Sequence, residues 1–179
     1  IAVLFEGVPE VLETKRAAFE FAVPRLRADA IVASTTSTML SSELAAFVPG
    51  PQRFLNSHWL NPAYLIPLVE LSPHAGTDPA LTARLRAILE AIGKKPVECA
   101  AAPGFIVPRL QALVMNEAAR MVEQGVASAE DVDRAVRYGF GIRYASMGVV
   151  EFIDYGGLDI LYYASHYLAG ALADPRFEP

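Results

Sequence analysis

The sequence predicts an α/β domain that is followed by an all-helical region. Short apolar runs alternate with helical patterns as far as Cys99, which is typical of strands and helices packed in layers. Beyond the break at residues 100–104, which contains Pro103 and Gly104, apolar residues recur only at helical spacing. We therefore expect a domain boundary near Pro103.

Five apolar runs mark the expected strands of the first region. Residues 1–5 form an uninterrupted apolar run, which is typical of a strand buried on both faces of a parallel sheet. Because such a sheet rarely starts at its first residue, we expect a preceding segment that is missing from this sequence. The other strands are expected at residues 30–33, 54–59, 66–71 and 96–99, and helices at residues 10–23 and 79–92.

Local signals indicate where these helices begin, end and pack. Asp78 and Pro79 supply an N-cap and a proline at the first helical position, and Gly93 fits the C-terminal stop. The hydroxyl-rich turn of residues 34–38 is expected to cap a helix that begins near Ser41. The first helix is expected to pack through the apolar residues of one face, which are Leu12, Phe19 and Val23.

The second region carries four helical patterns, at residues 105–124, 128–139, 147–155 and 158–173. The second of these starts with a sequence that resembles a capping box and is expected to end at Gly139. A cluster of tyrosines near the end of the chain is expected in the core or at a subunit contact, or alternatively in the wall of a substrate site. Its members are Tyr155, Tyr162, Tyr163 and Tyr167.

Composition and charge argue against several classes of function. The 179 residues carry a formal net charge of −5 with acidic and basic residues interspersed. No basic block is available to neutralise phosphates, so nucleic acid is not an expected partner. No apolar run reaches the roughly 18 residues that span a bilayer, and we identify no signal peptide. No cluster of Cys, His, Asp and Glu has the spacing of a zinc site, so we expect no metal.

Cys99 is the single cysteine of the sequence, so an internal disulfide cannot form. A reducing, cytoplasmic compartment is therefore the default expectation. We expect Cys99 to be a small buried apolar residue. A nucleophilic role is the alternative, but no adjacent His or Lys in the sequence would lower the pKa of its thiol.

His58 and Glu70 are the strongest candidates for chemistry. Glu70 interrupts the apolar run of residues 65–71, where a carboxylate is costly to bury without a partner. A carboxylate on one ring nitrogen of histidine fixes the tautomer and leaves the other nitrogen free to accept a proton. If their strands are neighbours, the two side chains form a general base and its orienter. The alternative for His58 is a structural core histidine, which is what we expect of His74 and His166.

Five segments, in order and at matching spacing, resemble the L-3-hydroxyacyl-CoA dehydrogenase family over essentially the whole chain. They are Phe5–Glu10 with Lys15, Ser37 in the Ser/Thr turn, the His58-x-x-Asn61-Pro62 motif, Leu68–Glu70, and Pro103–Val107. Residues 61–71 and 137–144 are similar to the branch that includes L-gulonate dehydrogenase, lambda-crystallin and carnitine dehydrogenase.

The resemblance implies a Rossmann-like α/β dinucleotide-binding domain over residues 1–102, incomplete at its N-terminus. An all-α domain over residues 103–179 would bind substrate and form a homodimer. The implied reaction interconverts a 3-hydroxyacyl-CoA, short-chain such as 3-hydroxybutyryl-CoA, and the 3-ketoacyl-CoA with NAD as cofactor. The alternatives are a dehydrogenase of a small free 3-hydroxy acid, such as gulonate or carnitine, and a non-catalytic structural protein on the same fold.

The resemblance also implies roles for individual residues. His58 is the implied general base, and Glu70 holds its ring. Ser37 and Asn61 would bind the reacting hydroxyl and the nicotinamide ribose region. The implied cofactor-binding residues are Gly7, Glu10, Lys15, Ser37 and Asn61.

Two features depart from the family pattern. The Gly-rich loop that cradles the NAD pyrophosphate lies, in the family, upstream of where this chain begins. Pro108 stands where the family commonly has Asn, and proline has neither an amide side chain nor a backbone donor. We therefore expect an altered substrate contact at Pro108. Family members usually continue beyond Pro179, so both ends are expected to be incomplete.

Overall fold

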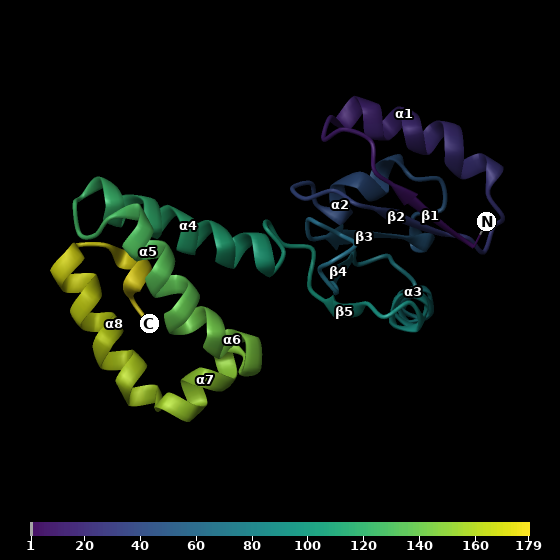
Figure 1. Ribbon diagram of the computed structural model, residues 1–179. Coiled ribbons are helices and arrows are strands. Elements are labelled where there is room, and N and C mark those ends of the chain that lie inside the picture. The colour runs from purple at the N-terminus through teal and green to yellow at the C-terminus, as the bar shows by residue number, and fades with distance from the viewer. Residues whose placement is uncertain (1) are drawn as a thin grey trace. The chain divides into compact units, whose positions relative to one another are not determined.

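The computed structural model describes residues 2–179, and the chain forms two compact units, Ile1–Val114 and Met115–Pro179. The boundary between the units falls within helix α4 (Val107–Glu123). The first unit contains the sheet and the second contains helices only, as the colouring along the chain in Figure 1 makes visible. The sequence therefore predicted the change from α/β to all-α structure.

The first unit contains a five-stranded mixed sheet in the order β1-β2-β3-β4-β5. The strands are β1 (Val3–Glu6), β2 (Ile31–Ser34), β3 (Phe54–Trp59), β4 (Leu68–Pro73) and β5 (Lys95–Glu98). Strands β1, β2 and β3 are parallel, β4 runs antiparallel to β3, and β5 is parallel to β4. All five predicted strands are present, although Ile1 lies outside the described residues.

The prediction that the first strand is buried on both faces is wrong. Within the described residues β1 forms an edge of the sheet, with β2 as its one neighbour. Phe5 is consequently 41% exposed and packs edge-to-face on Trp59, with 5.7 Å between ring centroids. Only Glu6 of this strand is buried.

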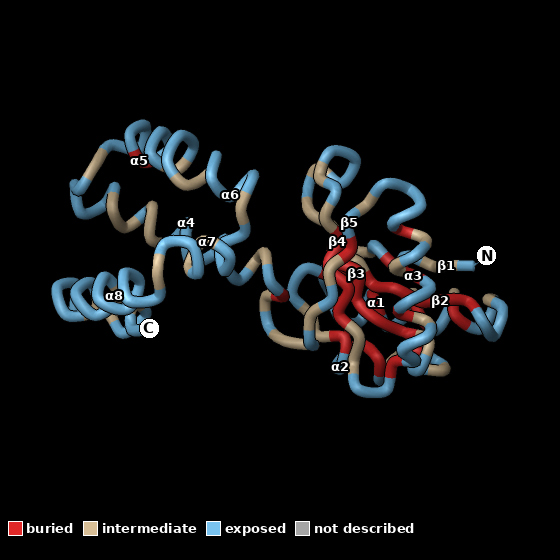
Figure 2. The backbone as a smooth tube through the Cα atoms, turned by 90° about the horizontal axis from the view of Figure 1, so that it is seen from below, coloured by how far each residue is buried: buried red, intermediate tan, exposed pale blue. Residues whose placement is uncertain are grey.

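Helices cover both faces of the sheet because buried apolar side chains alternate along its strands. Helices α1 (Leu12–Ala22) and α2 (Ser41–Leu44) pack on one face, and α3 (Pro79–Ala91) packs on the other. Short 3-10 helices lie at Val23–Arg25, Ala45–Phe47 and Pro51–Arg53. Figure 2 shows the buried backbone concentrated in the sheet of this unit.

The local signals are confirmed at α3, in part at α1 and not at α2. The Asp78 carboxylate accepts a hydrogen bond from the backbone N–H of Ala80, as an N-cap should. The hydroxyl-rich turn does not cap α2, whose N-cap residue is Leu40; the N–H of Leu40 donates to the Glu43 carboxylate at 3.2 Å. Phe19 and Val23 are buried as predicted for the first helix, but Leu12 is exposed and Lys15 is buried.

The second unit consists of the remainder of α4 and the helices that follow it. These are α5 (Ala129–Ala135), a π-helical segment (Val136–Gly141), α6 (Ile142–Ser146), α7 (Val149–Gly156), α8 (Leu158–Leu172) and a 3-10 turn (Pro175–Phe177). Among the described residues, no helix is long and apolar enough to cross a membrane.

The predicted helix end at Gly139 is wrong, because the helical backbone continues through the π-helical segment into α6. Gly141 permits this continuation. A β-carbon at Gly141 would lie 2.7 Å from the carbonyl oxygen of Val136, a distance that no other residue type tolerates without a shift of the backbone.

The second unit buries few of its large apolar side chains. Among the described residues of Met115–Pro179, Val132 is the one buried hydrophobic residue, and Figure 2 shows the exposed backbone of these helices. The prediction of a core position for the tyrosine cluster is therefore wrong, because Tyr155, Tyr162, Tyr163 and Tyr167 are all exposed. Their role in a subunit contact remains a prediction.

Candidate active site

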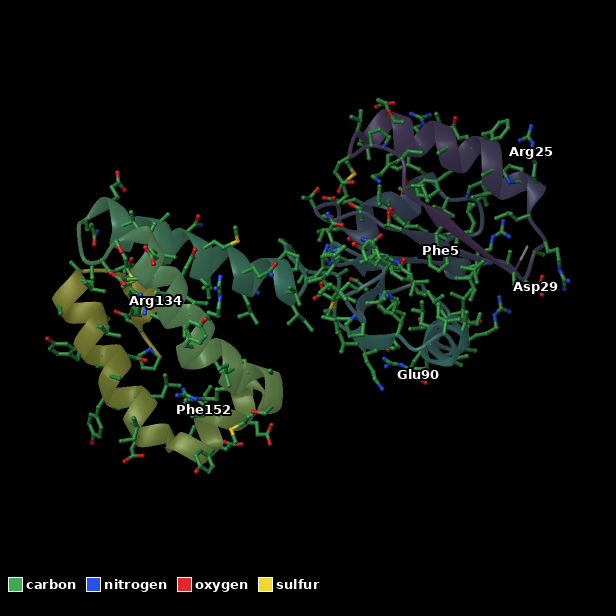
Figure 3. All side chains as sticks on the ribbon, in the orientation of Figure 1. Phe5, Arg25, Asp29, Glu90, Arg134 and Phe152 are labelled. Carbon is green, nitrogen blue, oxygen red and sulfur yellow. The ribbon has the colours of Figure 1, made fainter. Side chains whose placement is uncertain are left out.

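The candidate site lies where three parallel strands end. Strands β1 and β2 end at Glu6 and Ser34, and these two residues are paired in the sheet register. His58 is close to the carboxyl end of β3, the next parallel neighbour. Ligands in open α/β sheets bind outside the carboxyl ends of the strands, so this edge is the expected location. Figure 3 labels Phe5, which precedes Glu6 on β1.

His58 and Glu70 form a buried hydrogen-bonded pair across two strands. They occupy directly opposed positions in the antiparallel register of β3 and β4. The Nδ1 of His58 lies 2.7 Å from Oε2 of Glu70. Nε2 of His58 makes no hydrogen bond within residues 2–179. The pair therefore has the arrangement of a base and its orienter, and the sequence predicted that the two side chains would meet.

Glu70 also accepts the first N–H groups of helix α4. The backbone N–H groups of Ile106 and Val107 each donate to Oε1 of Glu70 at 2.8 Å. Pro108 has no N–H, and the N–H of Arg109 donates to the carbonyl of Gly104 at 2.9 Å. Glu70 is thus the N-terminal cap of α4 from a distant strand, at a helix end that favours a negative charge.

The turn that leads into α4 places an aromatic ring on the imidazole. Gly104 and Phe105 both have positive φ angles, of 78° and 46°. A β-carbon at Gly104 would lie 3.2 Å from Cβ of Arg109, so the position favours glycine. The buried Phe105 ring stacks on His58 with 5.1 Å between centroids and a 12° interplanar angle. A non-glycine residue at positive φ is uncommon, and such residues cluster at functional sites.

Ser37 lies on a turn whose backbone is bound by Glu10. One carboxylate oxygen of Glu10, Oε1, accepts from the N–H groups of Ser37 and Thr38, each at 3.1 Å. The same oxygen accepts from the hydroxyls of Thr38, at 2.8 Å, and of Thr36. The turn does not cap α2, because the N-cap position is Leu40 and the Thr36 hydroxyl accepts from the N–H of Met39, at 3.0 Å, before the helix begins.

These hydrogen bonds control the ionisation of Glu10. Partial burial by itself would raise the pKa of Glu10. Hydrogen bonds from the side chains of Thr36, Thr38 and Lys15 outweigh burial and lower the pKa from 4.5 to about 2. Glu10 is therefore ionised over the whole physiological range of pH.

Lys15 links Glu10 to the end of β1. Its ammonium lies 3.1 Å from Oε1 of Glu6 and 3.2 Å from Oε2 of Glu10, and its side chain is only 1% exposed. Glu6 in turn accepts a 2.6 Å hydrogen bond from the hydroxyl of Ser34. One buried cation therefore joins the segments that follow β1 and β2.

Asn61 and Gly7, the other predicted site residues, are exposed. Asn61 begins the loop between β3 and β4 and precedes Pro62 through a cis peptide bond. Lys94 donates to the carbonyl oxygen of Ile66 at 2.9 Å in the same loop. Gly7 follows β1, where a β-carbon would contact the Thr35 hydroxyl at 3.4 Å. Hydrogen bonds between these residues and His58 are not found in the described part of the chain.

Cys99 has the properties of an unreactive thiol. Burial, followed by the nearby charge of Glu70, raises the pKa of Cys99 above its ordinary value. A thiol in this environment stays protonated, which argues against the nucleophilic alternative. Residues 2–179 contain no group of three or more His, Cys, Asp or Glu side chains that could hold a metal ion.

Two contributors to the site were not identified from the sequence. The first is Phe105, and the second is the pair of N–H groups at Ile106 and Val107 that bind Glu70. The signal for both was the Pro103-Gly104 break directly before a helix, because free N–H groups gather at a helix start. What the sequence could not show is that this start faces Glu70, which lies 36 residues earlier than Ile106.

Comparison with known proteins gives two family matches that together span almost the whole chain. Residues 1–102 match the NAD binding domain of 3-hydroxyacyl-CoA dehydrogenase, and residues 104–179 match its C-terminal domain. The first match gives NAD as the cofactor, as the resemblance implied.

Curated relatives include members of the branch that the sequence resembled. The lambda-crystallin homolog of Bos taurus is 38% identical over 92% of this chain and 52% of its own length. The 3-hydroxybutyryl-CoA dehydrogenase of Bradyrhizobium diazoefficiens is 34% identical over 98% and 59%, and the L-carnitine dehydrogenase of Pseudomonas putida is 35% identical over 80% and 45%. The chain therefore spans about half the length of the curated relatives that it matches.

Solved structures show the same fold. A 5-formyl-3-hydroxy-2-methylpyridine 4-carboxylic acid 5-dehydrogenase, an NAD+-dependent dismutase, aligns with a TM-score of 0.89 and 33% identity over 95% of this chain and 55% of its own. The 3-hydroxyacyl-CoA dehydrogenase of Archaeoglobus fulgidus aligns with a TM-score of 0.85 and 38% identity over 99% and 61%. The Rossmann-like domain and the helical domain expected from the sequence are thereby confirmed. With both of its regions matched, the chain belongs to the 3-hydroxyacyl-CoA dehydrogenase family.

Proposed function

We propose that the protein is an NAD-dependent oxidoreductase that interconverts a 3-hydroxyacyl-CoA and the 3-ketoacyl-CoA, with a short-chain substrate such as 3-hydroxybutyryl-CoA. The observation that carries the proposal is the buried His58–Glu70 pair at the carboxyl edge of the sheet. Capping of α4 engages only Oε1 of Glu70, whereas Oε2 holds Nδ1 of His58, and this arrangement of an imidazole held by a carboxylate favours a catalytic purpose over a purely structural one.

In this reaction His58 is the general base that exchanges a proton with the substrate. Its Nε2 accepts the proton of the 3-hydroxyl as the carbon–hydrogen bond on the same carbon breaks, and returns it in the reverse direction. Glu70 holds Nδ1 and stabilises the imidazolium that forms. The N–H groups of Ile106 and Val107 keep Glu70 in place, so the pair does not have to reorganise during the proton transfer.

NAD supplies the hydride acceptor for this chemistry. The residues present fit such a group, because the turns after β1 and β2 gather exposed Gly7, Glu10 and Ser37 at the strand ends. Ser37 and Asn61 would bind the reacting hydroxyl and the ribose beside the nicotinamide. Residues 1–102 would hold the cofactor, and residues 103–179 would bind substrate.

A free 3-hydroxy acid is the alternative substrate class. Pro108 would alter the substrate contact, because proline offers no hydrogen bond where the family commonly has the amide of Asn. Pro108 is half-buried in the first turn of α4, directly after the two N–H groups that bind Glu70. An altered contact here would change which substrate is held against His58. The similarity to an L-carnitine dehydrogenase supports this alternative.

We also propose that the protein is a homodimer formed through its helical region. The last three helices expose large apolar side chains, among them Ile160, Leu161 and Leu168 on α8. An exposed apolar surface of this extent marks an interaction site, and a second copy of the chain is the commonest partner. A reducing compartment such as the cytoplasm fits a sequence with a single cysteine.

The test is oxidation of NADH, followed by its absorbance, with acetoacetyl-CoA as the substrate. The expected result is turnover with acetoacetyl-CoA and none with free acetoacetate. L-gulonate and L-carnitine, assayed in the forward direction with NAD, address the alternative. Turnover of either acid with none of acetoacetyl-CoA would move the assignment to the free-acid class. If every substrate is inert, the non-catalytic alternative replaces the proposal.

A further inference from the structure

Lys15 cannot offer its charge directly to a ligand in this structure. An ammonium has three protons, and four acceptor atoms surround Nζ. These are both carboxylate oxygens of Glu6, at 3.1 and 3.3 Å, the carbonyl of Val8 at 3.3 Å, and Oε2 of Glu10 at 3.2 Å. Because the side chain is buried as well, its protons are committed to the protein. Lys15 therefore acts on a site only through the groups that it holds.

Glu10 is the group through which Lys15 reaches the Ser37 turn. Its Oε2 pairs with Lys15, and its Oε1 accepts hydrogen bonds from four donors of the turn. Two of these donors are backbone N–H groups, so the carboxylate fixes the main chain and not merely a side chain. Hydrogen bonds to an ionised acceptor are about twice as strong as neutral ones, which favours a rigid turn.

The hydroxyl of Ser37 is left out of this network. The residue is exposed, and its Oγ makes no hydrogen bond within residues 2–179. The turn thus combines a fixed backbone with an uncommitted hydroxyl, which is the arrangement of a preorganised binding group. A second attachment at Asn56, whose side-chain amide donates to the carbonyl of Met39 at 2.9 Å, ties the end of the same loop to β3.

We propose that Glu10 is a positioning residue, which together with Lys15 fixes the Ser37 turn and so presents the Ser37 hydroxyl to substrate beside His58. The inference rests on the proposed function, and it deepens the role of Glu10, which the family resemblance placed among cofactor-binding residues. A direct contact of Glu10 with the cofactor predicts that Glu10→Ala weakens NADH binding even when Ser37 is absent. A positioning role predicts that Glu10→Ala has no further effect once Ser37 is absent.

The first measurement is a double-mutant cycle on the whole protein with Glu10→Ala, Ser37→Ala and the pair. A misplaced binding group can lower the rate by about 10²-fold. We expect each single variant to lower kcat by about 10–100-fold. The double variant should be no slower than the slower single variant, because residues that act as a unit are not additive. The dissociation constant for NADH, measured by fluorescence titration, should follow the same pattern: NADH binding should be no weaker in the double variant than in the weaker single variant, because a contact of Ser37 with the ribose can be lost only once.

Two further variants separate positioning from general damage. Glu10→Gln retains an oxygen for the turn but places an amide beside the Lys15 ammonium, so its kcat should lie between those of the wild type and Glu10→Ala. Glu13→Gln is the matched control, because it removes the same charge from an exposed carboxylate in the first turn of α1, about one turn after Glu10 in the sequence. It should leave kcat, the NADH affinity and the melting temperature unchanged.

The second measurement does not depend on activity. Hydrogen exchange at the amides of Ser37 and Thr38 should accelerate in Glu10→Ala and remain slow in Glu13→Gln. The proposal would be overturned if the kcat losses of Glu10→Ala and Ser37→Ala multiplied in the double variant. It would also be overturned if Glu10→Ala bound NADH about tenfold more weakly with an unchanged kcat. So would unchanged exchange at these two amides. A wild-type protein that is inert toward every substrate refutes the proposed function instead, and the exchange result still decides whether Glu10 fixes the turn.

Discussion

The sheet-containing unit and the helical unit are built on opposite principles. In Ile1–Val114, apolar side chains from both faces of the sheet are sealed beneath α1, α2 and α3. In Met115–Pro179, Val132 is the one buried hydrophobic residue among those described, and most large apolar residues are exposed. The first unit therefore buries a core of its own, whereas the second exposes apolar surface of the kind that marks interaction sites. We propose that the first unit carries the chemistry and the second the assembly, and the following experiments test that proposal.

The largest expected effect belongs to the sheet-containing unit. His58→Ala should lower kcat by about 10²–10⁴-fold, the usual contribution of a general base, without unfolding the protein. Steady-state kinetics and a thermal melt measure the two quantities. His74→Gln is the control, since the His74 ring bonds the carbonyl of Pro51 and the N–H of Gly76, away from the site. Wild-type turnover in His58→Ala would end the assignment of the base.

Glu70 should affect stability as well as turnover, because it caps a helix and holds the base. Glu70→Ala leaves the part-buried N–H groups of Ile106 and Val107 without their acceptor and removes the partner of buried His58, and an unsatisfied buried group costs about 1–3 kcal/mol. We expect the free energy of unfolding to fall by about 3 kcal/mol in urea titrations.

The matched control for Glu70 is the cap of α3. Asp78→Ala removes a local N-cap, which costs about 1 kcal/mol, and it should leave kcat unchanged. Equal losses of stability in the two variants would mean that the distant cap of α4 is worth no more than an ordinary local one. A loss of turnover in Asp78→Ala would contradict the view that the start of α4 supports catalysis and the start of α3 does not.

Assembly should respond to charge in the helical unit and not in the sheet-containing unit. Ile160→Glu places a carboxylate on α8, at a residue 64% exposed, and should weaken self-association by at least about tenfold if that surface is an interface. Phe21→Glu on α1, where the residue is 66% exposed, should leave association unchanged. Analytical ultracentrifugation measures both variants. A monomeric wild-type protein, or equal effects of the two substitutions, would remove the assembly role of the helices.

The smallest expected effect is a pH dependence at Glu10. Its folded pKa of about 2 lies below the ordinary value of 4.5, so the ionised form is bound more tightly in the folded state. The resulting stability is present above about pH 4.5 and is lost as the pH falls toward 2. We expect wild type to exceed Glu10→Gln by no more than about 1–2 kcal/mol near pH 6, since the carboxylate is 37% exposed to screening solvent.

That advantage should shrink progressively in urea titrations carried out between pH 4.5 and pH 3. A difference that stays constant over this interval would show that the stability of the variant is set by packing and not by the charge of Glu10. The comparison with Glu13→Gln removes the general effect of one fewer negative charge on the molecule.

Elements with a short-range cause were predicted well from the sequence. The β3 strand has the predicted bounds, and Asp78, Pro79 and Gly93 mark the limits of α3 as expected, because a cap, a fixed φ and a left-handed turn act within a few residues. The pairing of His58 with Glu70 was also predictable, since a carboxylate in an apolar run needs a partner.

The capping failure concerns a group whose partner is distant in the sequence. The hydroxyl-rich turn was expected to cap α2, but its Thr36 hydroxyl donates to Glu10, which lies 26 residues earlier. The local preference for a cap is worth about 1 kcal/mol, which a tertiary contact readily outweighs. The failure at Gly139 is local, because Gly141 tolerates the close approach of the Val136 carbonyl and the helical backbone continues.

The sequence by itself therefore determined the order of strands and helices, the change to an all-helical region and the identity of the paired imidazole and carboxylate. Only the tertiary structure decided that α4 begins against Glu70, that Phe105 stacks on His58 and that Glu10 binds the Ser37 turn. The reason is physical: periodicity and capping are properties of neighbouring residues, whereas the partner of a buried polar group depends on which distant segment the fold brings within about 3 Å.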